Sequence, residues 1–89
     1  MDEPYRVAFA PRVLRDLQRL PEKVAPACVE FIAGPLAENP QRLGKPLIGP
    51  LTGHHAARRG SYRVIYVIDE DARRLDVVHV DHRSAAYRV

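Results

Sequence analysis

The sequence predicts a single α+β domain in which a helix hairpin packs on a small, mainly antiparallel, twisted sheet in the order β-α-α-β-β-β. Three observations predict it: a length of 89 residues, two proline-bounded stretches with helical spacing of apolar residues, and three later strand-like stretches separated by turn residues. No repeat or linker interrupts residues 1–89, so one domain is expected over the whole chain. The apolar fraction of 46% is typical of a folded globule.

The first half of the chain predicts one strand and two helices. Residues 5–9 alternate at a period of two, which is typical of a strand. Pro11 suits the first turn of a helix, whose apolar stripe would contain Val13, Leu14, Leu17 and Leu20 before Pro21 ends it. A second helix is indicated by the stripe of Val24, Cys28, Phe31 and Ile32, with Leu36 one turn further on. Pro26 should fall in its first turn, and Gly34 and Pro35 should weaken its end.

The second half predicts a meander of three strands over residues 54–59, 62–68 and 74–80. Residues 39–50 contain several prolines and glycines and are expected to form the connection from the helices. Gly60 and Ser61 suit a two-residue turn with positive φ at the glycine, and residues 69–72 suit a longer polar turn. Both hairpins should therefore be antiparallel, and the helices should form one layer on the sheet.

Charge is distributed unevenly along the chain. The net charge is +3, yet residues 1–41 hold five basic and six acidic residues, and no acidic residue occurs between Glu38 and Asp69. That acid-free stretch contains five cations and two adjacent histidines: Arg42, Lys45, His54, His55, Arg58, Arg59 and Arg63. It favours a cationic surface for an anionic partner such as nucleic acid, while a merely solvated charged face is the alternative.

The remaining composition limits the cellular setting and the cofactors. A single cysteine, Cys28, cannot form an internal disulfide, and no secretory signal or membrane-length apolar run is visible, so a soluble cytoplasmic protein is expected. Cys28 lies in an apolar helix stripe and is expected in the core. Four histidines and one thiol show no zinc-ligand spacing, so neither a metal nor another cofactor is expected.

Arg63 is the most informative residue of the predicted sheet. Alternation puts Arg63, Ile65 and Val67 on one face, with Tyr62, Val64, Tyr66 and Ile68 on the other. An arginine among apolar neighbours needs an anion, because removing its charge from water is costly. An internal carboxylate, Asp76 or Asp81, is one candidate, and a phosphate group of a ligand is the other. Tyr62 and Tyr66, opposite Arg63, are expected to cover the core, and His79 is expected to be a hydrogen-bonded histidine of the sheet.

The chain resembles the RelE/ParE toxins of bacterial toxin–antitoxin modules, and their RelE branch in particular. The resemblance covers most of the chain. The residues that carry it are Arg15-Asp16-Leu17, Leu20-Pro21, Asn39-Pro40, Gly44-Lys45-Pro46-Leu47, Leu51-Thr52-Gly53, Arg58-Arg59-Gly60-Ser61-Tyr62-Arg63-Val64-Ile65-Tyr66, Val80-Asp81-His82-Arg83 and Tyr87. It implies the fold of the RelE and microbial-ribonuclease type.

In function, the resemblance implies a ribosome-dependent mRNA endoribonuclease that cuts in the ribosomal A site without a cofactor and inhibits translation. The partners implied are the ribosome, mRNA and a neutralising antitoxin of the RelB-like or Phd/YefM-like kind, with operator DNA reached only through the antitoxin. Position by position, Arg63 and Arg83 look like the arginines that contact the scissile phosphate. Tyr87 looks like the aromatic residue that stacks on a base, and His82 resembles a histidine that some branches use.

The sequence departs from the family pattern where the general base is concerned. Some ribonuclease members carry two lysines where this chain has His54 and Ala56, and another branch carries a glutamate where this chain has Leu47. Because a histidine titrates near neutral pH, His82 or His54 is the candidate for proton transfer, with Tyr87 a poorer base. Arg42, Lys45, His54, His55, Arg58 and Arg59 are predicted to contact RNA or the ribosome, although a solvated turn is an alternative for Arg58 and Arg59.

Two other functions remain compatible with the sequence. One is a non-enzymatic inhibitor of DNA gyrase of the ParE kind, which has no need of a phosphate-directed set of arginines. The other is an inactive relative that only binds its antitoxin, which the loss of the usual lysines would permit.

Overall fold

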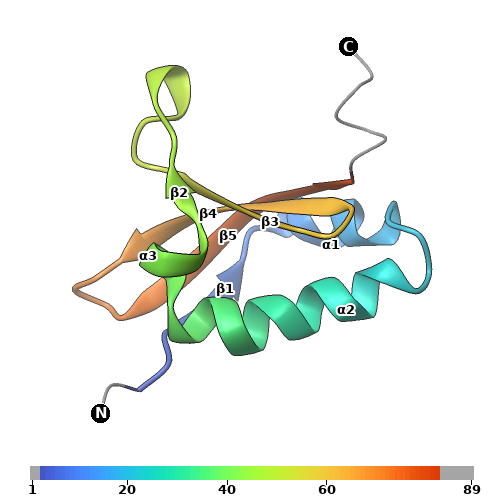
Figure 1. Cartoon of the computed structure of the whole chain (residues 1–89), viewed down its shortest axis with the longest axis horizontal. Coiled ribbons are helices and arrows are strands. Elements are labelled where there is room, and N and C mark those ends of the chain that lie inside the picture. The colour runs from blue at the N-terminus through green and yellow to red at the C-terminus, as the bar shows by residue number, and fades with distance from the viewer. Residues whose placement is uncertain (1–2, 83–89) are drawn as a thin grey trace.

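A computed structural model describes residues 3–82 of the chain. The elements are β1 (Arg6–Phe9), α1 (Pro11–Gln18), α2 (Val24–Phe31), the π-helical turn η1 (Ile32–Leu36), α3 (Pro40–Leu43), β2 (Lys45–Pro46), the 3₁₀ turn η2 (Gly49–Leu51), β3 (His55–Arg59), β4 (Tyr62–Asp69) and β5 (Arg74–His82). The strands form one sheet in the order β1-β5-β4-β3-β2. In Figure 1 α2 lies below the strands, α1 is seen behind them at about their height, and the loop between β2 and β3 rises above them.

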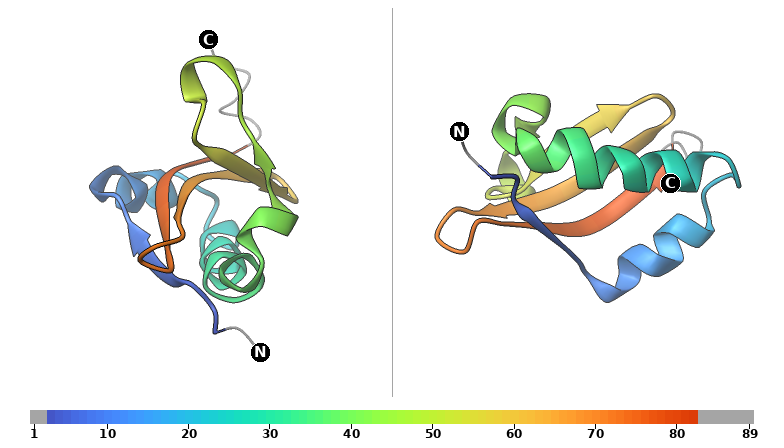
Figure 2. Two further views of the ribbon diagram at one scale, coloured as in Figure 1. Left: turned by 90° about the vertical axis from the view of Figure 1, so that its left-hand side faces the viewer. Right: turned by 90° about the horizontal axis from the view of Figure 1, so that it is seen from below.

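The observed sheet confirms the predicted α+β fold. Strand β1 pairs with β5 in parallel, and the pairs β5–β4, β4–β3 and β3–β2 are all antiparallel. Gly60 has a φ of 59°, which is the left-handed conformation expected in the two-residue turn between β3 and β4. The two views of Figure 2 show that the three long strands twist strongly and that α2 runs along one side of them.

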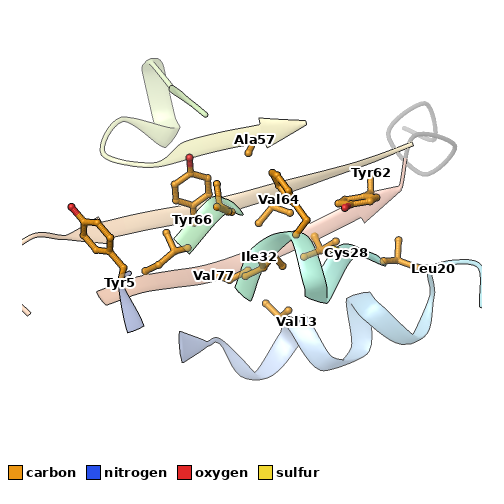
Figure 3. Packing of buried hydrophobic residues seen from close by; sticks show 14 residues of the cluster. Tyr5, Val13, Leu20, Cys28, Ile32, Ala57, Tyr62, Val64, Tyr66 and Val77 are labelled. Atoms are coloured by element: carbon orange, nitrogen blue, oxygen red, sulfur yellow. The ribbon is translucent and has the colours of Figure 1, made fainter. Parts of the chain in front are cut away.

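The core lies between the two helices and the sheet. Val13 of α1, Cys28 of α2, Ile32 of η1 and Val64 of β4 are fully buried, and Figure 3 shows them converging from these elements. Each such aliphatic side chain contributes about 1.5–3 kcal/mol to folding through the apolar surface it removes from water. Burial also raises the pKa of the Cys28 thiol to about 11, which suppresses its reactivity and agrees with the predicted core position.

The first helix differs from its predicted stripe at one residue. Val13 and Leu20 are buried and Leu17 packs against the core, but the Leu14 side chain is 63% exposed. Adjacent residues on an α-helix are rotated by about 100°, so the residue after Val13 points away from the core. The inclusion of Leu14 in the buried stripe was therefore wrong.

The second helix does not stop at its glycine and proline. Instead, the chain continues from α2 into η1, which contains Gly34 and Pro35 and keeps Leu36 fully buried. Proline has no N–H to donate and its ring clashes with the carbonyl four residues earlier, so a wider π-type turn accommodates it. The sequence correctly indicated an irregularity here but not its form.

The connection over residues 39–50 is more structured than the sequence predicted. It contains α3 and the short edge strand β2, and Tyr66 of β4 anchors it by donating a hydrogen bond to the carbonyl of Pro40 at 2.5 Å. A Cβ atom at Gly44 would overlap the Tyr66 hydroxyl, so the chain can pass this strand closely only with glycine at that position. Pairing of β2 with β3 thereby adds a fifth strand and brings Lys45 to the sheet.

Candidate phosphate-binding face

The sheet presents a face opposite α2, which we call the open face; α1 lies at the β5 edge of the sheet. Its residues follow from the strand register, because directly paired residues point to the same side. Arg58 of β3 pairs with Arg63 of β4, and Arg63 pairs in turn with Asp81 of β5. The next row on the same face contains Lys45, Ala56, Ile65 and His79. Two arginines and a lysine therefore share one side of the sheet.

A β-bulge decides which residues of β5 belong to the open face. Ile65 pairs with His79 whereas Tyr66 pairs with Val77, so Val78 is an extra residue in β5. After the bulge, the side to which odd- and even-numbered residues of β5 point is exchanged. Val77 before the bulge and Val80 after it therefore both lie on the helix side, opposite Tyr66 and Val64. His79 and Asp81 consequently join Arg63 on the open face.

Arg63 is bound by an internal carboxylate. Its Nη2 donates to Asp81 Oδ2 at 2.8 Å and its Nε donates to Asp81 Oδ1 at 3.3 Å. The Asp81 side chain is 16% exposed and the Arg63 side chain 37% exposed, so the guanidinium remains accessible from solvent. Of the two internal partners that the sequence offered, Asp81 is the one used, while Asp76 binds Arg74 at 2.6 Å.

Asp81 is part of a longer polar chain that reaches α1. The Nε2 atom of His79 lies 3.3 Å from Asp81 Oδ2, and its Nδ1 atom lies 2.9 Å from Asp16 Oδ2. Asp16 also lies 3.5 Å from Arg12 Nε and accepts a hydrogen bond from the Val80 backbone N–H at 3.1 Å. The prediction that His79 is a hydrogen-bonded histidine of the sheet is confirmed.

Asp16 occupies the edge of β5 that β1 leaves open. Strand β1 pairs with β5 only as far as Val77, and the Asp16 carboxylate binds the Val80 N–H beyond that point. Burial raises the pKa of this carboxyl, but the hydrogen bonds from Val80 and His79 and the charges of His79 and Arg12 outweigh burial and lower it below 3.8. This buried acid was not among the residues singled out from the sequence. The signal that could have found it is its helical spacing, because Asp16 lies one turn after Arg12 and three residues after the buried Val13.

Several predicted RNA-contacting residues lie on the other side of the sheet. Arg59 pairs with Tyr62, and its guanidinium lies over the Phe31 ring, 4.9 Å from the centroid. His55 pairs with Tyr66 and stacks on its ring with centroids 5.6 Å apart. Arginine and histidine that cover aromatic rings in this way stabilise the helix side of the sheet. These two residues are therefore separated from Arg58 and Arg63.

The remaining predicted site residues fall in three places. His82 pairs with Tyr62, so the register puts it on the helix side rather than beside Arg63. Arg42 is exposed on α3, and His54, which immediately precedes β3, has a buried Nδ1 atom without a hydrogen-bond partner. Arg83 and Tyr87 lie outside the described residues. Within residues 3–82 the open face thus brings together Lys45, Arg58 and Arg63, with Asp81 and His79 as their polar neighbours.

The family model described as "ParE toxin of type II toxin-antitoxin system, parDE" matches residues 7–87. The chain belongs to this family. Within the RelE/ParE superfamily it falls in the RelE branch, because it is 58% identical over 88 residues to Toxin RelE of Mycobacterium tuberculosis, covering 99% of this chain and 91% of the relative. Toxin RelG of the same organism is 45% identical over 85 residues, covering 96% of this chain and 98% of the relative.

Solved structures of the RelE type have the same fold. The toxin in the toxin–antitoxin complex RelBE2 from Mycobacterium tuberculosis superposes with a TM-score of 0.88 at 44% identity, covering 91% of this chain and 100% of that one. The archaeal RelE–RelB complex from Pyrococcus horikoshii gives a TM-score of 0.70 at 26% identity, covering 98% of this chain and 100% of that one. The chain is therefore a toxin of the type II class with a RelE fold.

No helix within residues 3–82 is long and apolar enough to cross a membrane. In the same residues no group of three or more histidine, cysteine, aspartate or glutamate side chains is arranged to hold a metal ion.

Proposed function

We propose that this toxin is a ribosome-dependent mRNA endoribonuclease that cuts mRNA in the ribosomal A site and thereby inhibits translation. The observation that carries the proposal is the open face, where Lys45, Arg58 and a solvent-accessible Arg63 share one side of the sheet. Guanidinium groups stay protonated and offer paired donors to phosphate oxygens. The relatives named Toxin RelE and Toxin RelG support the same class of activity.

The proposed reaction uses the RNA's own 2′-hydroxyl as the nucleophile. Its oxygen attacks the adjacent phosphorus while the bond to the 5′ oxygen of the next nucleotide breaks, leaving a cyclic phosphate and a 5′-hydroxyl. The pentavalent phosphate carries additional negative charge, and we assign its stabilisation to Arg63 and Arg83. Tyr87 is proposed to stack on a base, and His82 or His54 to transfer a proton.

Binding of the RNA backbone is assigned to the cations that flank Arg63. Lys45 and Arg58 are both exposed on the open face, and Arg42 is exposed on the preceding α3. Contacts of this kind fix the position of a nucleic acid without reading its sequence. Codon preference would then come from the ribosome or from groups outside this row.

The proposed protein partner is an antitoxin of the RelB-like or Phd/YefM-like kind. The two solved relatives are RelE toxins in complexes with RelB-type antitoxins, as their names RelBE2 and RelE–RelB state. An acidic antitoxin segment on the open face would neutralise the cations there and exclude RNA from them. Operator DNA would be reached only through that antitoxin.

Inhibition of DNA gyrase is the second candidate. Two observations favour it: the matched family model is described as a ParE toxin, and Arg63 is already neutralised by Asp81. A gyrase supercoiling assay with the purified toxin separates the two functions directly.

The decisive experiment is cleavage mapping on programmed 70S ribosomes with purified toxin. We expect cuts that leave a 5′-hydroxyl, and we expect Arg63→Ala to reduce the cleavage rate by at least about a hundredfold. His82→Ala and Tyr87→Phe, assayed beside it, assign the remaining roles. Arg74→Ala is the matched control, because Arg74 is also an ion-paired arginine of the sheet but lies at the opposite end of β5 from Asp81. Undiminished cleavage by Arg63→Ala, or gyrase inhibition without any cleavage, would contradict the proposal.

A further inference from the structure

We infer that Asp81 is an internal competitor of RNA: its carboxylate holds Arg63 in the place of a phosphate and must be displaced before Arg63 binds the substrate. The inference deepens the proposed function, since it concerns the same arginine, and rests on it. It adds a residue outside the predicted catalytic set that would control how readily the toxin engages RNA.

The geometry of the ion pair carries the first part of the argument. Asp81 takes both the Nε and the Nη2 of Arg63, which is the same edge of the guanidinium that suits a bidentate phosphate. One of the two hydrogen bonds is long at 3.3 Å, and the arginine is 37% exposed. An anion arriving from solvent can therefore compete for this edge at modest cost.

The surroundings of Asp81 carry the second part. Asp81 Oδ2 lies 2.8 Å from Arg63 Nη2 and 3.3 Å from His79 Nε2. His79 is itself held by Asp16 on the other side of its ring, and Asp16 is fixed by Arg12 and the Val80 N–H. When Arg63 leaves, the His79 ring stays 3.3 Å from Asp81, and in its protonated form it donates to Asp81 through Nε2 and to Asp16 through Nδ1. With His79 protonated, the exchange therefore leaves no unpartnered carboxylate at Asp81, whose side chain is 16% exposed.

A functional consequence follows from competition. Free RNA displaces Asp81 from Arg63 only to the extent that its concentration in solution allows. mRNA fixed on the ribosome presents its phosphate to Arg63 at a much higher effective concentration. The contact would therefore weaken binding of free RNA more than it slows cleavage of positioned mRNA. Asp81 would in this way restrict the toxin to ribosome-bound substrate.

The test measures binding of a short single-stranded oligoribonucleotide whose 2′-O-methyl groups prevent cleavage. We expect Asp81→Asn to bind it about fivefold more tightly than wild type in fluorescence anisotropy at fixed salt, because a partly exposed pair of this kind is worth up to about that factor. Asp76→Asn is the matched control: it removes the same charge from the same face of β5 but releases Arg74, and less than about a twofold change is expected.

A double-mutant cycle separates competition from a general charge effect. In the Arg63→Ala background, Asp81→Asn should no longer tighten binding, because the released group is absent. Equal effects of the two asparagine variants, or an unchanged affinity of Asp81→Asn, would overturn the inference.

If Asp81→Asn folds poorly, the inference can still be tested on the wild-type protein by NMR. The side-chain Nε–Hε NMR signal of Arg63 should shift when wild type is titrated with the same oligonucleotide, and a stationary signal in saturated protein would also refute the exchange. If the toxin fails to cut mRNA on ribosomes but these binding results hold, the nuclease proposal fails while Asp81 remains a competitor for anions at Arg63.

Discussion

The two faces of β4 differ in burial and charge although they belong to the same strand. On the helix side, Tyr62, Val64 and Tyr66 are all buried in the core. On the open side, Ile65 is also buried, but Arg63 is partly exposed and paired with a carboxylate. Apolar residues on the first face stabilise the fold, whereas the charged residue on the second costs desolvation that its ion pair only offsets. The comparison teaches that the position of Arg63 on the open face is not optimised for stability and that its guanidinium is accessible for binding.

The largest expected difference between the two faces is in the free energy of unfolding. Ile32→Ala removes a fully buried side chain that packs against the helix side of the sheet, and should destabilise the toxin by about 2–5 kcal/mol in urea denaturation. Ile48→Ala is the matched control, because Ile48 is 89% exposed and should change stability by less than about 0.5 kcal/mol. Similar losses for both variants would show that the core is not where we place it.

Asp16 joins the two regions and should show an intermediate effect that depends on pH. Its folded-state pKa lies below the usual value, so its ionised form stabilises the protein above pH 3.8 and this contribution disappears as the pH falls through the lower folded value. At neutral pH, Asp16→Asn should cost about 1–3 kcal/mol, because hydrogen bonds from Val80 and His79 to a charged acceptor are lost.

Urea denaturation of wild type and Asp16→Asn at several pH values tests this expectation. The difference between the two proteins should be largest at neutral pH and should shrink under acid conditions, where the wild-type carboxyl is protonated. Asp76→Asn provides the comparison with a carboxylate that is 31% exposed. A difference that stays constant with pH would mean that the charge of Asp16 does not contribute.

Much of the fold was predictable because local patterns decide it. Period-two alternation from Tyr62 to Ile68 correctly assigned both faces of β4, and Gly60 correctly indicated the tight turn. The pairing of β2 was not predictable, because a strand of two residues is too short to show an alternation of apolar and polar side chains. The segment that leads into β2 is anchored by the Tyr66 hydroxyl, which donates to the Pro40 carbonyl from a distant part of the sequence.

The candidate site was predicted only in part, and the bulge at Val78 explains why. Unbroken alternation would have put Asp81 with Val77 on the helix side and His82 with Asp76 on the open side. The extra residue exchanges them, so that Asp81 rather than His82 lies beside Arg63. Sequence spacing cannot reveal such an insertion, because Val77, Val78 and Val80 are all compatible with either face. The roles of Arg83 and Tyr87 remain predictions, since both lie outside the described residues.

Substitution of Arg63 should affect stability less than substitution of Ile32 or Asp16, and it is the most discriminating of the three tests. Arg63→Ala removes a partly exposed ion pair, so it should change the free energy of unfolding by no more than about 1 kcal/mol in urea denaturation. In that variant Asp81 still lies 3.3 Å from His79 Nε2 and is 16% exposed, so water and the protonated form of the imidazole limit the penalty of removing Arg63 from the carboxylate. A loss comparable with that of Ile32→Ala would mean that Arg63 serves the fold. A near-neutral result would leave substrate binding as the physical reason for an arginine between Tyr62 and Val64, because folding alone would then gain almost nothing from its charge.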